Sequence, residues 1–264
     1  MGFYRYLSYI SFPWGHYSFL LVSIFKLFKK MQRILKLRYI VIPLSLRHRA
    51  YLPLDRSPKD FDEALLFAYF ADGYERLGPG LKKARYQIVV DVGAHYGFFT
   101  LKMSNKAEKI IAVEPAIRNL HILYNNVRLN KLHNVIIIPV ACWSSQGFAL
   151  MEGETDEMLR IVKAHGLGNS KIMEKAVRLA RLEDVLKTLG VAKVDLLKMD
   201  VEGAEEECLK GLGAFLDRVQ NIVLEVHGIK LLSKVRRILH SNYSIKIYRI
   251  SDNDFIVYGR ARSC

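Results

Sequence analysis

The feature that most constrains this chain is a run of short apolar segments that alternate with helical patterns from residue 87 onward. The segments expected as strands are residues 87–92, 109–113, 135–140, 194–199 and 222–226. The helices are expected from about residue 98, over 116–130 and over 205–216, and a terminal hairpin over 244–250 and 255–258. Apolar strands that alternate with helices are typical of a mostly parallel sheet covered on both faces. The sequence therefore predicts an α/β fold with a seven-stranded sheet that ends in an antiparallel hairpin.

The segment before this pattern, residues 1–59, has a different character and is expected to form a separate N-terminal helical arm. Residues 1–50 carry nine Lys or Arg side chains and no Asp or Glu, so much of the net charge of +14 lies there. Residues 19–40 have the spacing of an amphipathic helix with a basic face. Its apolar positions are Leu20, Ile24, Leu27, Phe28, Met31, Ile34 and Leu35. Such a helix suits peripheral contact with an anionic membrane, or packs its apolar stripe on the domain that follows; both interpretations stay open.

The cysteines and the first residues bear on the compartment. Three widely spaced cysteines without a CxxC pair indicate neither a disulfide framework nor a zinc site. The apolar stretch near the N-terminus is interrupted by Arg5 and His16 and lacks a small-residue cleavage site. These features favour a cytoplasmic protein, with the inner face of the membrane as the alternative suggested by the basic arm.

The first two predicted strands end in residues that suit a nucleoside ligand. Residues 91–97 read DVGAHYG, in which Gly93 and Gly97 allow a tight turn and a close approach of a ligand to the backbone. This is not the G-x-G-x-x-G pattern that meets a pyrophosphate, although an NAD enzyme is the competing interpretation. Asp91 is expected near a ligand ammonium group, and Glu114 is placed to accept hydrogen bonds from both ribose hydroxyls. Each feature alone also fits an ordinary strand–helix corner.

An adenine pocket is expected at the end of the third strand, around Ala141 and Cys142. Ligands of such sheets bind outside the carboxyl ends of the strands, where the strand order reverses. The neighbouring Trp143 is available for stacking, although a lone Trp more often packs in a core.

Four segments resemble the FkbM family of methyltransferases. They are VVDVGAHYGFFTL (89–101), AVEPAIRNLHILYNNVRLN (112–130), VDLLKMDVEGAEEECLKG (194–211) and IVLEVHG (222–228). The third resembles the family's Lys-x-Asp-x-Glu-Gly-Ala-Glu signature, and together they span about residues 85–258 of a domain expected over 60–264. The resemblance implies a Rossmann-like class I methyltransferase fold and S-adenosylmethionine as the methyl donor. It also implies a hydroxyl acceptor on a sugar, glycan, lipid-linked saccharide or other natural product.

The residues expected to act on the acceptor are Asp200, Glu202 and His227. Asp200 and Glu202 follow the fourth strand, where an acceptor would meet the methyl group, and His227 ends the fifth strand as a candidate base. The structural alternatives are a buried pair of Lys198 and Asp200, a capping acid and a hydrogen-bonded histidine. Mg²⁺ held by two or three of Asp200, Glu202, Glu225 and His227 is conceivable, but the spacing does not demand it and no metal site is assigned.

Two other functions compete with O-methylation. The basic charge suggests a methyltransferase that acts on RNA or DNA, but residues 200–203 read DVEG, and paired carboxylates repel phosphate. Nucleic acid is therefore disfavoured as a partner, and the sequence points to no oligomeric state. The second alternative is a membrane-associated adaptor that keeps the fold without turnover, against which the intact acids and glycines argue.

Overall fold

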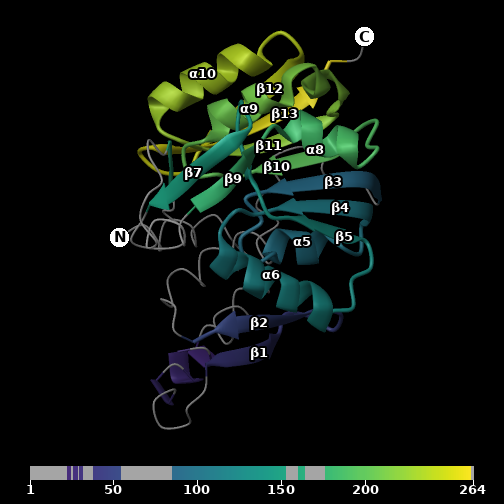
Figure 1. The fold of residues 1–264 in the computed structure, drawn as a ribbon, viewed down its shortest axis with the longest axis vertical. Coiled ribbons are helices and arrows are strands. Elements are labelled where there is room, and N and C mark those ends of the chain that lie inside the picture. Colours follow the sequence, from purple (N-terminus) through teal and green to yellow (C-terminus); the bar gives the residue numbers. More distant parts are fainter. Residues whose placement is uncertain are drawn as a thin grey trace.

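The computed structural model describes residues 38–54, 85–152, 160–163 and 176–262, together with seven helical positions between residues 23 and 31 (Figure 1). The predicted boundary at residues 59 and 60 lies outside these ranges. Among the described residues, no helix has both the length and the apolar composition that crossing a bilayer requires.

A seven-stranded sheet forms the centre of the domain. Its strands are β3 (Tyr86–Val92), β4 (Ala107–Val113), β5 (Val135–Ile138), β10 (Leu196–Met199), β11 (Asn221–His227), β12 (Tyr243–Arg249) and β13 (Asp254–Ala261). The strand order is β12-β13-β11-β10-β3-β4-β5. The five strands from β11 to β5 are parallel, whereas β13 pairs antiparallel with both β11 and β12. The predicted sheet and its terminal hairpin are thus confirmed.

The apolar strands are buried because helices cover both faces of the sheet. The helices are α5 (Phe98–Met103), α6 (Ile117–Leu129), α8 (Leu182–Thr188), α9 (Glu205–Leu212) and α10 (Ile229–Leu239), with a 3₁₀ turn η4 (Gly213–Arg218). Successive strand residues point to opposite faces, so Val90 packs with α8, α9 and α10, whereas Val89 packs with α5. Figure 1 shows the α9–α10 layer and the α5–α6 layer on opposite sides of the sheet.

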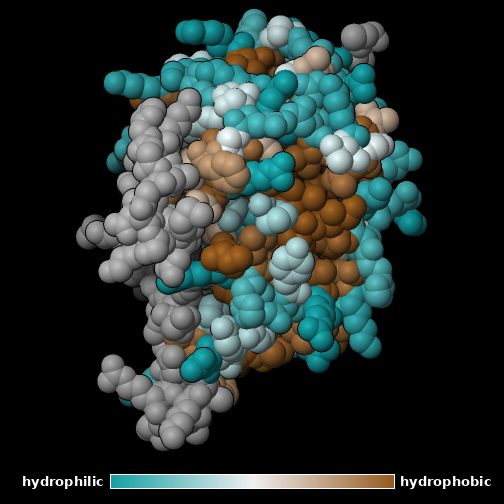
Figure 2. Space-filling model, viewed as in Figure 1, coloured by the Kyte–Doolittle hydropathy of each residue, from teal (hydrophilic) through white to brown (hydrophobic). Residues whose placement is uncertain are grey.

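The edge strand β5 is less covered than the strands at the centre. All four of its residues are half-buried. Figure 2 shows apolar side chains gathered over the β3–β4–β5 end of the sheet.

A second, four-stranded sheet lies between β5 and β10 in the chain, where no strand was predicted from the sequence. Its strands are β6 (Ala141–Cys142), β7 (Gly147–Glu152), β8 (Arg160–Lys163) and β9 (Ala176–Ala180), in the order β6-β9-β7-β8. The third predicted strand therefore ends at Ile138 rather than at residue 140, and Ala141 begins a strand of the second sheet.

The N-terminal arm contains a β-hairpin, which corrects the helical prediction. Strands β1 (Tyr39–Pro43) and β2 (Arg49–Pro53) pair antiparallel, so the helix expected over 19–40 has ended before Tyr39. The side chain of Asn126 on α6 accepts a hydrogen bond from the Tyr51 backbone at 2.6 Å. Asn130 accepts one from the Arg49 backbone at 2.8 Å and donates one to its carbonyl at 2.7 Å. The hairpin is thereby fixed to the domain through α6.

Candidate active site

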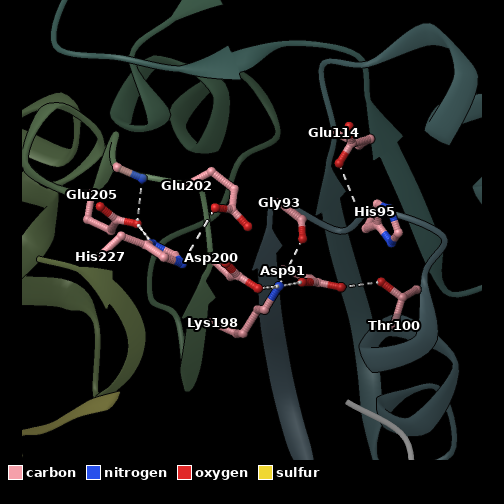
Figure 3. A network of polar contacts seen from close by, with 11 residues as sticks. Asp91, Gly93, His95, Thr100, Glu114, Lys198, Asp200, Glu202, Glu205 and His227 are labelled. Atoms are coloured by element: carbon pink, nitrogen blue, oxygen red, sulfur yellow. Dashed lines mark hydrogen bonds and ion pairs between the residues drawn. The ribbon is translucent and has the colours of Figure 1, made fainter. Parts of the chain in front are cut away.

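The candidate site lies at the carboxyl-terminal ends of the parallel strands β3, β4, β10 and β11 (Figure 3). Because β3 pairs parallel with β4 and β10, and β10 with β11, the carboxyl ends of these strands meet. Asp91 and Glu114 come from the first pair of strand ends, and Asp200 and His227 from the second. The structure thus brings together residues that the sequence placed at separate strand ends.

The loop after β3 has the tight turn that its glycines predicted. Gly93 and Gly97 have φ angles of 74° and 84°, in the left-handed region where a Cβ atom is unfavourable. A Cβ atom on Gly93 would lie 1.7 Å from the Asp200 carbonyl oxygen, and one on Gly97 would lie 2.4 Å from Leu123 Cδ1. Glycine is therefore required by the close approach of the protein's own chain, and the approach of a ligand stays a prediction.

A buried ion pair fixes this loop to the neighbouring strand. Lys198 Nζ lies 3.3 Å from Asp91 Oδ1 and donates a hydrogen bond to the Gly93 carbonyl at 2.8 Å. Thr100 donates to the other Asp91 oxygen at 2.7 Å. Burial alone lowers the pKa of Lys198, but the charges of Asp91 and Asp200 outweigh it and raise the pKa above its usual value. The buried lysine pair is present, with Asp91 closer than Asp200, which lies at 3.9 Å.

This arrangement bears on the role predicted for Asp91. Its side chain is inaccessible to solvent, and its carboxylate faces Thr100 and the Lys198 ammonium group. The Lys198 ammonium group offsets the charge of Asp91 and repels a second cation that approaches it. Direct contact with a ligand ammonium group stays a prediction, and the geometry favours an indirect role in which Asp91 positions the loop.

Glu114 is also buried, and protein donors already occupy most of its acceptor capacity. Its Oε2 accepts a hydrogen bond from the His95 backbone at 2.9 Å. Its Oε1 accepts bonds from the Ala116 backbone at 2.9 Å and from Asn119 Nδ2 at 3.2 Å. Burial raises the pKa of Glu114, although these donors oppose that shift. Since a carboxylate offers roughly four acceptor positions, roughly one remains for a ribose hydroxyl instead of the predicted two contacts.

Ala141 and Cys142, predicted to line an adenine pocket, lie in β6 beside β9. Only 2% of Ala141 and 3% of Cys142 are exposed, and the Cys142 carbonyl accepts a hydrogen bond from the Cys208 thiol at 2.9 Å. Burial raises the pKa of that thiol. These residues pack in the core here, so the adenine contact stays a prediction.

The acceptor-side residues form a compact group with His227 between two carboxylates. His227 Nε2 lies 3.6 Å from Glu202 Oε2, and His227 Nδ1 lies 2.9 Å from Glu205 Oε1. Asp200, Glu202 and His227 each offer a potential ligand atom, and these atoms lie within 4.8 Å of one another. Glu202 has a φ angle of 52°, a strained conformation for a non-glycine residue that is often found at functional sites.

The charges of this group shift the pKa values of its members. Burial, followed by the charge of Asp200, raises the pKa of Glu202 to about 7. Burial lowers the pKa of His227, but its hydrogen bond to Glu205 and the charge of Glu202 raise it to about 10. His227 is therefore protonated at neutral pH in this state. The role of His227 as a base stays a prediction, because a protonated imidazole must lose its proton before it can accept another.

Two residues of the site were missed in the sequence. Glu205 stands first in α9, where an acidic residue is readily interpreted as favouring the helix dipole. Thr100 lies in the first turn of α5, and its hydroxyl faces back to β3. A hydroxyl residue in the first turn after a glycine loop is a weak signal. Glu205 is the last residue of the Lys-x-Asp-x-Glu-Gly-Ala-Glu segment, which could have singled it out, although that segment does not link it to His227.

The comparisons with known proteins agree with this geometry. The strand order and the site at the carboxyl ends of the strands define a Rossmann-like class I methyltransferase fold. Residues 91–245 match the family model described as the methyltransferase FkbM domain, which covers more than half of the chain. The chain belongs to the FkbM methyltransferase family.

Two curated relatives and one solved structure illustrate the likeness. The chain is 33% identical to methyltransferase sdnD of Sordaria araneosa, over 52% of this chain and 65% of that protein. It is 30% identical to methyltransferase 1 of Beauveria bassiana, over 52% and 64%. The matches thus span slightly less than two thirds of these relatives. The crystal structure of a methyltransferase FkbM from Methylobacillus flagellatus is similar over 74% of this chain and 47% of that one, with 16% identity and a TM-score of 0.48.

Proposed function

We propose that this protein transfers a methyl group from S-adenosylmethionine to a hydroxyl group of a sugar, glycan, lipid-linked saccharide or other natural product. The observation that carries the proposal is that Glu114, Asp200 and Glu202 lie on either side of Gly93 at the ends of the strands (Figure 3). Membership of a methyltransferase family supports the reaction class.

The residues of the site fit a cationic nucleoside. S-adenosylmethionine supplies a methyl group bonded to a positively charged sulfur. Glu114 has acceptor capacity left for one ribose hydroxyl. Asp200 and Glu202 carry negative charge at the neighbouring strand end, which attracts a cation. The ion pair of Asp91 and Lys198 holds the intervening loop through the Gly93 carbonyl.

On the acceptor side, Asp200 and Glu202 are accessible, in contrast to the buried acids of the loop. Their side chains are 29% and 37% exposed. In methyl transfer the acceptor oxygen forms a bond to the methyl carbon while the carbon–sulfur bond breaks. The proton of the hydroxyl group then passes to a carboxylate oxygen of Asp200 or Glu202, within hydrogen-bond reach. Alignment of the acceptor by these residues contributes the larger share of the acceleration.

The same group of acids argues against a nucleic-acid substrate. Asp200, Glu202, Glu205 and Glu225 gather near the ends of β10 and β11, and burial together with the charge of Asp200 raises the pKa values of Glu202 and Glu225. A phosphate backbone at this position would be repelled, whereas a neutral hydroxyl would not. We therefore favour an uncharged acceptor group.

The test is the detection of the methylated product. Glycans, lipids and small metabolites from cells with and without this protein would be compared by mass spectrometry after labelling with methyl-labelled methionine. Labelled species found only with the protein would then be tested as acceptors of the purified chain. We expect Asp200→Asn to lower kcat by a factor of about 100 or more, the usual contribution of a general base.

The control is Asp252→Asn, at a position where 92% of the side chain is exposed. It should leave the product yield unchanged. An unchanged yield of labelled product from both Asp200→Asn and Glu202→Gln, or a product that proves to be RNA, would overturn the proposed acceptor chemistry.

A further inference from the structure

We infer that Asp200, Glu202 and His227 bind one divalent transition-metal ion. The sequence assigned no metal here and did not favour Mg²⁺, because the spacing alone does not require one. The folded arrangement adds three observations: the distances between the ligand atoms, the orientation of His227 and an excess of negative charge.

The distances suit a single ion. The potential ligand atoms of the three side chains lie within 4.8 Å of one another, and His227 Nε2 and Glu202 Oε2 are 3.6 Å apart. Two ligands at about 2.1 Å from a metal in tetrahedral geometry are separated by about 3.4 Å. Small side-chain rotations would therefore complete the site. Asp200 follows β10, Glu202 lies in the next turn and His227 ends β11, so adjacent elements hold all three (Figure 3).

His227 is oriented as a metal ligand by a carboxylate outside the triad. Glu205 is inaccessible to solvent, and its Oε1 accepts a hydrogen bond from His227 Nδ1 at 2.9 Å. This bond directs Nε2 toward Glu202. In a metal-binding histidine, the N–H group of the second ring nitrogen usually donates a hydrogen bond to such a carboxylate. Among the residues that the structure describes, Glu205 Oε2 is buried without a hydrogen-bond partner, so this carboxylate is under-compensated.

The group also carries more negative than positive charge. Asp200, Glu202 and Glu205 are three carboxylates close together, and within the described ranges the cations paired with them are His227 and Lys198. Lys198 is already bound to Asp91 and to the Gly93 carbonyl. A divalent ion would offset the remaining repulsion between the carboxylates. Binding of the ion would also account for the strained backbone of Glu202, where φ is 52°.

The donor set indicates the kind of metal. Two carboxylates and one imidazole suit Mn²⁺ or Zn²⁺ better than Mg²⁺, which prefers oxygen ligands only. An ion here would lie beside the acceptor and would make its hydroxyl proton easier to remove, and the oxygen of Asp200 or Glu202 that does not bind the ion would accept that proton. This role rests on the proposed function, whereas binding of the ion does not.

The experiment is a titration of the untagged, chelator-treated full chain with Mn²⁺, followed by electron paramagnetic resonance and calorimetry. We expect one Mn²⁺ per chain and coupling of the metal to an imidazole nitrogen. His227→Gln should abolish that coupling, and the control His240→Gln should retain it. Asp200→Asn and Glu202→Gln should each weaken binding at least tenfold, and Glu205→Gln by about 10- to 100-fold. Zn²⁺ should compete with Mn²⁺ more strongly than Mg²⁺ does.

The inference is overturned if the wild-type chain binds none of these ions, or if its binding is unchanged by all four site variants. The wild-type result does not depend on the folding of a variant. Binding of S-adenosylmethionine without Mn²⁺ or Zn²⁺ binding would remove this inference and leave the proposed function intact. Metal binding without S-adenosylmethionine binding would support this inference and contradict the proposed function.

Discussion

The two halves of the candidate site handle charge in opposite ways. On the loop side, at the ends of β3 and β4, Asp91 is paired with Lys198, and Glu114 accepts three hydrogen bonds from protein groups. On the acceptor side, at the ends of β10 and β11, four carboxylates surround His227. The loop side is buried and balanced, whereas Asp200 and Glu202 remain accessible and unbalanced.

The difference indicates that the loop side mainly stabilises the fold, whereas the acceptor side is arranged for binding and chemistry. A buried, paired group costs free energy when it is broken, so the loop side holds the fold in position. Accessible like charges destabilise the fold unless something binds between them. Substitutions should therefore lower stability on the loop side and raise it on the acceptor side.

The largest effect is expected for Gly93→Ala. The new Cβ atom would lie 1.7 Å from the Asp200 carbonyl oxygen, so β3 and β10 would have to separate. We expect the free energy of unfolding to fall by more than about 4 kcal/mol in urea denaturation. Gly190→Ala is the matched control, because φ is 67° there and no atom lies within 4 Å of the new Cβ. It should cost about 1 to 2 kcal/mol; equal costs would show that close packing at Gly93 is unimportant.

The next effect is expected for Lys198→Met, which leaves the buried Asp91 carboxylate without its cation. Removing one member of a buried pair should lower the free energy of unfolding by about 3 to 5 kcal/mol. Lys187→Met removes a lysine that pairs with Glu183 and whose side chain is 59% exposed, and it should cost less than about 1 kcal/mol. Thermal unfolding of both variants at neutral pH measures the difference. A similar small loss in both would remove the contrast between the two halves.

The smallest effect, with the opposite sign, is expected for Glu202→Gln in metal-free protein. The pKa of Glu202 is raised to about 7 in the folded protein. The stability that its protonated carboxyl contributes is therefore fully present below pH 4.5 and is lost as the pH rises through 7. At pH 8 the variant should be more stable than the wild type by about 1 kcal/mol, after allowing for screening of a side chain that is 37% exposed. At pH 4.5 the two should be equal.

Glu206→Gln serves as the control for that measurement. Glu206 pairs with Lys210 and Lys234, and hydrogen bonds from these lysines lower its pKa. Its replacement should slightly destabilise the protein at pH 8. A loss of stability in both variants would contradict the proposed repulsion on the acceptor side.

The sequence predicted the main sheet because its strands are apolar and separated by clear helical patterns. It did not predict the second sheet, since β6 has two residues and the strands β6 to β9 lie far apart in the chain. The helical spacing of the N-terminal arm was extended too far, into the β-branched residues of Tyr39–Pro43. A repeating pattern identifies an element better than it locates the end of that element.

For the site, the sequence predicted which strand ends would meet but not which side chains would pair. Lys198 was expected beside Asp200, two residues away, because alternate residues of a strand share a face. Lys198 does lie 3.9 Å from Asp200, but the parallel register of β10 and β3 also places it opposite Asp91, which is closer at 3.3 Å. Such a register joins residues more than a hundred positions apart, and a pattern along the chain does not encode it.

The central claim is that the strand ends around Gly93 bind S-adenosylmethionine, and calorimetry with the purified wild-type chain tests it most directly. We predict one site per chain with a Kd of about 1 to 100 µM. Glu114→Gln should weaken binding about tenfold or more, and Glu206→Gln should not change it. Absence of heat or of saturation with both S-adenosylmethionine and S-adenosylhomocysteine, in a folded wild-type sample, would contradict the claim.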